Sequence, residues 1–383
     1  MRSDVPGPCP RGPGTYAHAE VRGADSGSLV SVHPGVLPTC LSGAPRSPTS
    51  ATPLLPAGWV RRTTHLEMLW DGASLMLSGA ARDVRASQDR MEVLRRASVK
   101  AYVDSGKRLR ELELDPKSAG SMELCGSEIA SGFRARAHEC CPELAGTPAG
   151  LLLDDLPGVV LIAPYMHLRD MALRGEPPGK NIPPEAVSML ADVCAGWRAG
   201  GTAMESVARG DGIPLQDCPP AEPLEAPDDA GAWHAIAPLE SGRMRRRRRL
   251  DVGITPGPSP TSVEPSAVVV DAMFRDSHGE PDGTEVVLHE YSLTVEVSRS
   301  DSSILEVQPV ARVLPFPECP LAIAYVAELK GKSVGELREL VPAMLRGTKG
   351  CTHLNDLLRV LADVPRLASS LLLGDAPLTW AVA

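Results

Sequence analysis

Two stretches of the chain carry the same order of residues 194 positions apart, and this repetition limits the possible folds more than any other feature. The matched pairs are Val93 with Val287, Leu94 with Leu288, Ser98 with Ser292 and Val103 with Val297. Both stretches partly alternate apolar and polar side chains, which is typical of strands with one face in water. We therefore predict two related units. The alternative is two unrelated meanders of similar strands.

The correspondence continues in order on both sides of these stretches. The further pairs are Arg82-Asp83 with Arg275-Asp276, Leu112-Glu-Leu-Asp-Pro with Leu305-Glu-Val-Gln-Pro, Cys125 with Cys319, Gly146-Thr147 with Gly347-Thr348, and Leu153-Asp-Asp-Leu with Leu354-Asn-Asp-Leu. In this alignment Cys351 and His353 fall on Gly150 and Leu152. The first copy has apolar bulk where the second has a thiol and an imidazole, so we expect it to be a packing partner without a site.

The fold class follows from three expected strands and the helices after them. We predict strands near 267–275, 285–298 and 304–314, followed by apolar residues at helical spacing. Antiparallel strands followed by helices indicate an α+β class, with two related units of about three strands each, packed by helices. The apolar run 151–164 is interpreted as two short buried strands.

Composition divides the chain and limits its partners. Residues 1–56 are rich in Pro, Gly, Ser and Thr and are predicted to be a disordered tail. We expect a degenerate N-terminal α+β unit over 57–175, a helix and Pro-rich linker over 176–240, and a C-terminal α+β unit over 241–373. The partner is predicted to be an unidentified protein.

Charge and apolar content exclude several function classes. The net charge of −9 argues against a nucleic-acid partner, and no apolar run reaches the ~18 residues needed to span a membrane. The run 243–249 contains six arginines and is interpreted as a solvated segment beside a flexible linker; gripping phosphate or an acidic partner is the alternative. Nine cysteines and a start that has no charged-then-apolar leader predict free thiols in the cytoplasm.

The candidate site lies in Gly350-Cys-Thr-His-Leu. Cys351 precedes a threonine that we expect to cap the last helix, and Cys319 precedes Pro320 at the start of an earlier helix. Backbone partial charge at a helix N-terminus favours thiolate, which binds metals and attacks electrophiles. With His353 these thiols provide three ligands for zinc or an iron-sulfur cluster, and Asp271 or Asp276 is the expected fourth.

Three hypotheses about this site remain open. It binds zinc or an iron-sulfur species in a non-catalytic module, or Cys351 is the nucleophile of a thiol enzyme with His353 as its base, or the chain is an interaction module with no site. In the structural interpretation Cys351 fills a buried gap and His353 bonds a neighbouring loop. His289 is interpreted as a strand-face residue. No GxGxxG, Walker, HExxH or GxSxG motif supports nucleotide binding or common hydrolase chemistry.

Residues 58–370 resemble the long actinobacterial members of an uncharacterised family, classified as a domain of unknown function. The resemblance lies in Val60-Arg-Arg-Thr-Thr-His-Leu-Glu-Met-Leu-Trp, Leu151-Leu-Leu-Asp-Asp-Leu-Pro and Gly350-Cys-Thr-His-Leu-Asn-Asp-Leu, with Cys-Thr-His-Leu as the hallmark. It implies a bacterial cytosolic protein and brings no activity with it.

A fainter similarity is to iron-sulfur scaffold proteins of the IscU and NifU type. Cys319, the turn Leu329-Lys-Gly-Lys-Ser-Val-Gly-Glu-Leu and Cys351-Thr-His353 are similar to their Cys, Gly-Lys-Thr-Val-like turn and adjacent His and Cys. The chain departs from the scaffolds by having no middle cysteine and by Pro320-Leu321 in place of an acidic residue. The similarity implies a shared fold with a reduced metal site.

Overall fold

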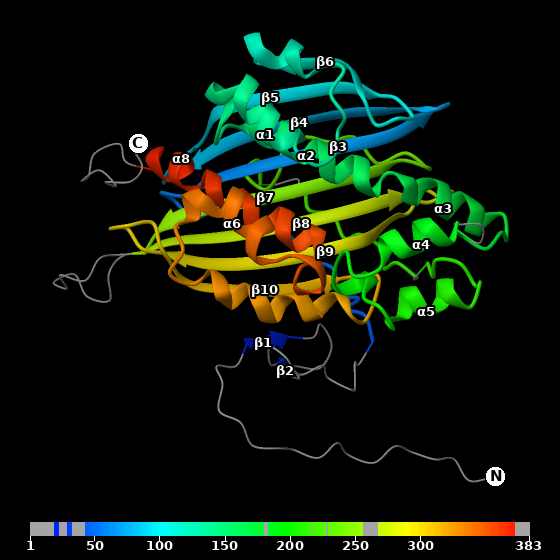
Figure 1. Cartoon of the computed structure of the whole chain (residues 1–383). Helices are drawn as coiled ribbons and strands as arrows, with labels where there is room; N and C mark the ends of the chain where they lie inside the picture. The colour runs from blue at the N-terminus through cyan, green and yellow to red at the C-terminus, as the bar shows by residue number, and fades with distance from the viewer. Residues whose placement is uncertain are drawn as a thin grey trace.

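The computed structural model describes residues 19–22, 29–32, 43–179, 183–215, 217–226, 229–255 and 267–371. Eight of its strands form one antiparallel sheet in the order β10-β9-β8-β7-β3-β4-β5-β6 (Figure 1). These strands are β3 (Val60–Asp71), β4 (Ser74–Ala86), β5 (Met91–Val103), β6 (Leu109–Asp115), β7 (Met244–Ile254), β8 (Val268–Gly279), β9 (Glu285–Val297) and β10 (Ile304–Val313). A separate two-stranded sheet pairs β1 (Ala19–Arg22) with β2 (Leu29–Val32).

The α+β class is confirmed, but the expected pair of three-stranded units is not what the described residues form. Each half of the chain contributes four consecutive strands, and the two sets meet where β3 pairs with β7. Val60 opposes Val252 and Met68 opposes Met244 along this central pair. One continuous sheet therefore replaces two separate ones.

Helices α1, α2, α6 and α8 lie over one face of the sheet, whereas α3, α4 and α5 lie toward one end of it (Figure 1). The α-helices are α1 (Phe133–Cys140), α2 (Pro148–Ile162), α3 (Pro164–Leu173), α4 (Pro184–Leu190), α5 (Thr202–Ala208), α6 (Leu337–Met344), α7 (Thr352–Val360) and α8 (Val364–Ser369). Short 3-10 helices cover 119–124, 142–144, 195–197, 319–329, 334–336, 347–349 and 361–363. Helix α2 packs on β3, β4 and β5, whereas α7 packs on β8 and β9.

The prediction of two buried strands over 151–164 is wrong. Thr147 caps the N-terminus of α2 by accepting a hydrogen bond from the Gly150 amide, and Pro148 occupies the first turn. A continuous apolar run does not distinguish a buried strand from a buried helix, and here the cap decides for a helix. The helical stretch Pro148–Leu173 is long and apolar enough to cross a membrane, but 67% of its most apolar window is buried within the protein.

The interpretation of the arginine run as a solvated segment is also wrong. Residues 244–254 form the central strand β7, and Arg245 to Arg249 are all at most 5% exposed. Alternation sends Arg246 and Arg248 toward the helices and their neighbours to the opposite face. Both sets end on carboxylates from other elements, so tertiary contacts neutralise the run.

The face opposite the helices is partly covered by two irregular segments, 43–56 and 217–240. Arg61 donates to the carbonyls of Pro53 and Gly231, and Arg275 donates to those of Thr49 and Glu222. We expected 1–56 to be a disordered tail; apart from β1, β2 and 43–56, that segment lies outside the described residues. The expected Pro-rich linker packs on the sheet where it is described.

Register irregularities recur at matching places in the two halves. Between β4 and β5 the register shifts after the pair Asp83 and Arg95, and between β8 and β9 it shifts after Asp276 and His289. These positions differ by 193 and 194 residues. A β-bulge bends its strand and redirects side chains, so each half presents an aspartate on the helix face at an equivalent bend.

Candidate metal centre

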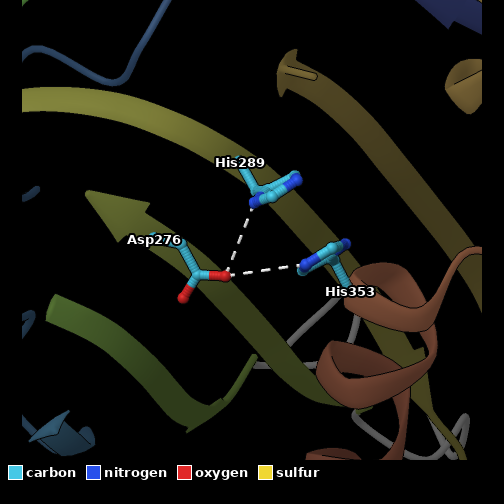
Figure 2. A group of neighbouring side chains, drawn as sticks. All are labelled: Asp276, His289 and His353. Atoms are coloured by element: carbon cyan, nitrogen blue, oxygen red, sulfur yellow. Dashed lines mark ion pairs between the residues drawn. The ribbon is translucent and has the colours of Figure 1, made fainter. Parts of the chain in front are cut away.

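Three side chains from three elements meet beside the bulge in the C-terminal half (Figure 2). Asp276 lies near the end of β8, His289 faces it from β9, and His353 points down from the first turn of α7. Asp276 and His289 are directly opposed in the strand register. The ligand atoms of the three residues all lie within 4.8 Å of one another.

Two imidazole nitrogens face the same carboxylate oxygen without a hydrogen bond. His289 Nδ1 lies 3.6 Å and His353 Nε2 lies 3.7 Å from Asp276 Oδ2. Both nitrogens are buried and have no hydrogen-bond partner among the described residues. Buried polar atoms are nearly always satisfied, so two orphaned nitrogens aimed at one point call for a further group there.

Arg246 holds the Asp276 carboxylate from the other side. Its Nε and Nη2 atoms donate to Oδ1 and Oδ2 at 2.9 and 3.0 Å, and its Nη1 donates to Asp356 at 3.1 Å. Burial alone would raise the pKa of Asp276, but Arg246 and His289 overcome it and hold the pKa below its ordinary value. The carboxylate is therefore anionic and fixed in orientation.

Helix α2 approaches this ion-pair network because it carries Gly158. A Cβ atom at that position would lie 2.1 Å from Arg246 Nη1 and 2.6 Å from Asp356 Oδ2. The glycine thus leaves room for the guanidinium between sheet and helices.

The orientation of His353 leaves Nε2 available as a ligand. Its Nδ1 lies 3.4 Å from Thr352 Oγ1 and 3.9 Å from Cys351 Sγ, on the side of the ring away from Asp276. Burial lowers the pKa of His353 well below its ordinary value, and the neighbouring His289 acts in the same direction. A neutral imidazole bonded through one nitrogen is the usual form of a histidine that binds metal through the other.

The spacing of these atoms suits a divalent ion bound by nitrogen and oxygen. Ligand atoms about 2.1 Å from one tetrahedral ion would lie about 3.4 Å apart. The two histidine nitrogens lie 3.6 and 3.7 Å from Asp276 Oδ2, and all three ligand atoms lie within 4.8 Å of one another. The two rings are stacked, with centroids 3.7 Å apart and planes 16° apart. A bound ion lies in the plane of each imidazole, so loading requires one ring to rotate out of the stack.

The predicted ligand set is brought together only in part. Cys351 contacts His353 through Nδ1, away from Asp276, and both Cys351 and Cys319 are buried. Cys351 itself is the N-cap residue of α7, a place we had expected Thr352 to take. Burial raises the pKa of Cys351 and raises that of Cys319 well above its ordinary value, so burial favours the neutral thiols over the expected thiolates.

Two further features depart from the predicted set. Asp271 projects from the opposite face of β8, where it pairs with Arg249, because strand residues an odd number apart face opposite ways. The alternative acid, Asp276, is the one beside His353. Sequence reasoning missed His289 and also Cys194, whose thiol lies with that of Cys319 against Gly196. His289 had one usable signal, its position opposite Asp276 in a hairpin.

Residues 246–366 match the family described as "Protein of unknown function (DUF2889)". The match spans β7 to α8 and includes all three residues of the centre. No curated protein and no solved structure is significantly similar to the chain. The similarity to iron-sulfur scaffolds therefore stays a prediction.

Proposed function

We propose that the C-terminal half binds one divalent transition-metal ion of the zinc class at Asp276, His289 and His353, as a non-catalytic module. The observation that carries this proposal is the pair of buried, unpartnered imidazole nitrogens facing one carboxylate oxygen. Two imidazoles and a carboxylate suit zinc and its neighbours better than Mg²⁺ or Ca²⁺, which prefer oxygen ligands. An iron-sulfur cluster has less support because no thiol belongs to this group.

We also propose that the two halves are copies of one ancestral unit. The matching bulges support this, and so do two ion pairs across the central strands. Arg61 of β3 pairs with Asp251 of β7, and Arg245 of β7 pairs with Glu67 of β3. The two arginines are 184 residues apart in the sequence, and so are the two acids. A two-fold axis between β3 and β7 would produce this pattern, because each strand would give its arginine to the acid of the other.

The N-terminal counterpart of the centre supports a cation in the C-terminal one. Asp83 takes the place of Asp276, and Arg62 binds it with Nε and Nη2 as Arg246 binds Asp276. Arg95 takes the place of His289, and its Nη1 lies 3.6 Å from Asp83 Oδ2. The first copy thus supplies a second positive group to its carboxylate, whereas the second copy supplies two imidazoles.

A metal at this position would tie α7 to β8 and β9. We therefore expect a structural role for it, in a cytoplasmic protein that acts through a protein partner. The arginines of β7 are paired with carboxylates inside the protein. This supports the expectation that nucleic acid is not that partner.

Metal analysis of purified protein tests the proposal. After dialysis against zinc and then buffer, the protein should retain about one equivalent, while His289→Ala and His353→Ala should each lose affinity at least about tenfold. Cys351→Ala is the matched control on the same helix turn and should retain the ion. Binding should also weaken below about pH 6, where free imidazoles take up protons.

Three outcomes would contradict the proposal. Zinc retained equally by the wild type and both histidine variants would place the ion elsewhere. Protein that retains no zinc yet reacts rapidly with a thiol probe at Cys351 would favour the thiol-enzyme hypothesis. Protein with neither property would be an interaction module without a site.

A further inference from the structure

Two arginines face each other on the outer face of the N-terminal half. Arg82 on β4 is directly opposite Arg96 on β5. Arg82 is 9% exposed, and its Nη2 donates a hydrogen bond to the Ala230 carbonyl at 2.7 Å. Its Nε atom is buried and has no partner among the described residues. Like charges placed directly opposite on neighbouring strands are destabilising, so this pair calls for a counter-charge.

The C-terminal half shows what fills the corresponding place. Arg275 and Glu290 correspond to Arg82 and Arg96 at offsets of 193 and 194 residues, and they are likewise opposed in register. Arg275 Nε donates to Glu290 Oε2 at 2.6 Å, and Glu290 is fully buried. The first copy therefore has the Arg96 guanidinium where the second has the Glu290 carboxylate. It still has Arg82, the counterpart of the arginine that Glu290 binds.

The surroundings of Arg82 compensate its charge only partly. His234 hydrogen-bonds to Thr63 and to His65, and burial lowers the pKa of both imidazoles to about 3, so they carry no charge at neutral pH. Asp229 is the nearby acid among the described residues. Its Oδ1 accepts from the Gly231 amide, its Oδ2 is buried without a hydrogen-bond partner, and the described residues show no ion pair between it and Arg82. Within the described part of the site, two arginines face one aspartate, which leaves a net positive charge.

We propose that Arg82 and Arg96 form a binding site for the carboxylate of a small organic acid, which takes the place that Glu290 occupies in the other half. Arg82 Nε donates to one oxygen at the floor of the site, and the exposed Arg96 closes over the ligand from solvent. Charge-assisted bonds from guanidinium to carboxylate are among the strongest available to such a ligand. This site is separate from the metal centre and does not depend on it.

Arg96→Glu tests the proposal by rebuilding the internal pair. Because Arg96 is exposed, the variant should fold, and its unfolding temperature in chloride should exceed that of the wild type by several degrees. Acetate replacing chloride at constant ionic strength should raise the wild-type temperature, since a ligand bound by the native state stabilises it. Arg96→Glu should lose that extra rise. Lys100→Glu is the control, with the same charge change on the same face of β5, and should keep it.

Each contrary result has a distinct meaning. An equal acetate response in wild type and Arg96→Glu would show a general salt effect and overturn the site. No stabilisation of Arg96→Glu in chloride would show that Asp229 already neutralises Arg82, and would overturn it as well. A larger response to phosphate than to acetate would overturn the assignment to a carboxylate. None of these outcomes depends on zinc, so the test leaves the metal proposal untouched.

Discussion

Buried arginines of β7 are matched by carboxylates that come from other elements. Arg246 binds Asp276 and Asp356, and Arg248 binds Asp155 on α2 through Nε and Nη2. Ionised side chains are almost never fully buried unless they are paired. The strand therefore needs Asp155 of Leu-Asp-Asp-Leu in α2 and Asp356 of Leu-Asn-Asp-Leu in α7, whatever the site binds.

Removing one guanidinium should be costly at the residue scale. Arg246→Met leaves Asp276 buried without its two charge-assisted bonds, and we expect a loss of about 3–5 kcal/mol in the free energy of unfolding. Arg243→Met, just before β7, should cost less than about 1 kcal/mol because that side chain is partly exposed. Urea unfolding with EDTA present measures both, and equal losses would contradict this account.

At the scale of elements, the irregular segment 217–240 is held to the sheet by neutral histidines. His234 makes one hydrogen bond through each ring nitrogen. Its Nδ1 lies 2.8 Å from Thr63 Oγ1, and its Nε2 lies 2.6 Å from His65 Nδ1. Burial lowers the pKa of each histidine to about 3, and Arg245, Arg247 and other nearby cations act in the same direction. The native state thus resists protonation of both rings.

This linkage predicts the sign of the pH dependence. Between pH 6.5 and about 3 the unfolded chain binds protons at His65 and His234 that the native state does not, so stability falls as pH falls. By pH 5 each imidazole lowers the free energy of unfolding by up to about 2 kcal/mol. His65→Asn with His234→Asn should flatten the dependence of urea midpoint on pH from 7 to 5, whereas the exposed His138→Asn should not. An unchanged slope would refute the linkage.

At the scale of the whole molecule, the halves share one sheet and one set of buried charges. Arg62 of β3 binds Asp363 from the C-terminal half, and Arg248 of β7 binds Asp155 from the N-terminal half. Separation would expose the apolar flanks of β3 and β7 and leave these charges unpaired. The family match to 246–366 therefore does not delimit a unit that is stable by itself.

Fragments 43–215 and 217–371 test this dependence. Each alone should give no cooperative thermal transition in near-ultraviolet circular dichroism, and mixing them should restore one. The uncut chain is the reference for the restored transition. A fragment that unfolds cooperatively without the other would mean that the central strand pair is not required.

The sequence by itself determined several strand regions and the place of His353. Alternation predicted the strand regions of β5 and β9, whereas the duplication that the collinear matches predicted stays a proposal. These features are local, since side-chain period and caps depend on near neighbours. The Cys-Thr-His-Leu hallmark correctly placed His353 in the first turn of a helix.

Only the tertiary structure decided the character of the arginine run and the partners of His353. Whether six arginines are solvated or buried depends on carboxylates up to 178 residues away along the chain, such as that of Glu67, which binds Arg245. Strand parity put Asp276 and His289 on the helix face and Asp271 on the other, and no spacing in the chain fixes which face the helices cover. Charge compensation and ligand geometry are relations between distant elements, so they are settled only when the sheet and its helices pack.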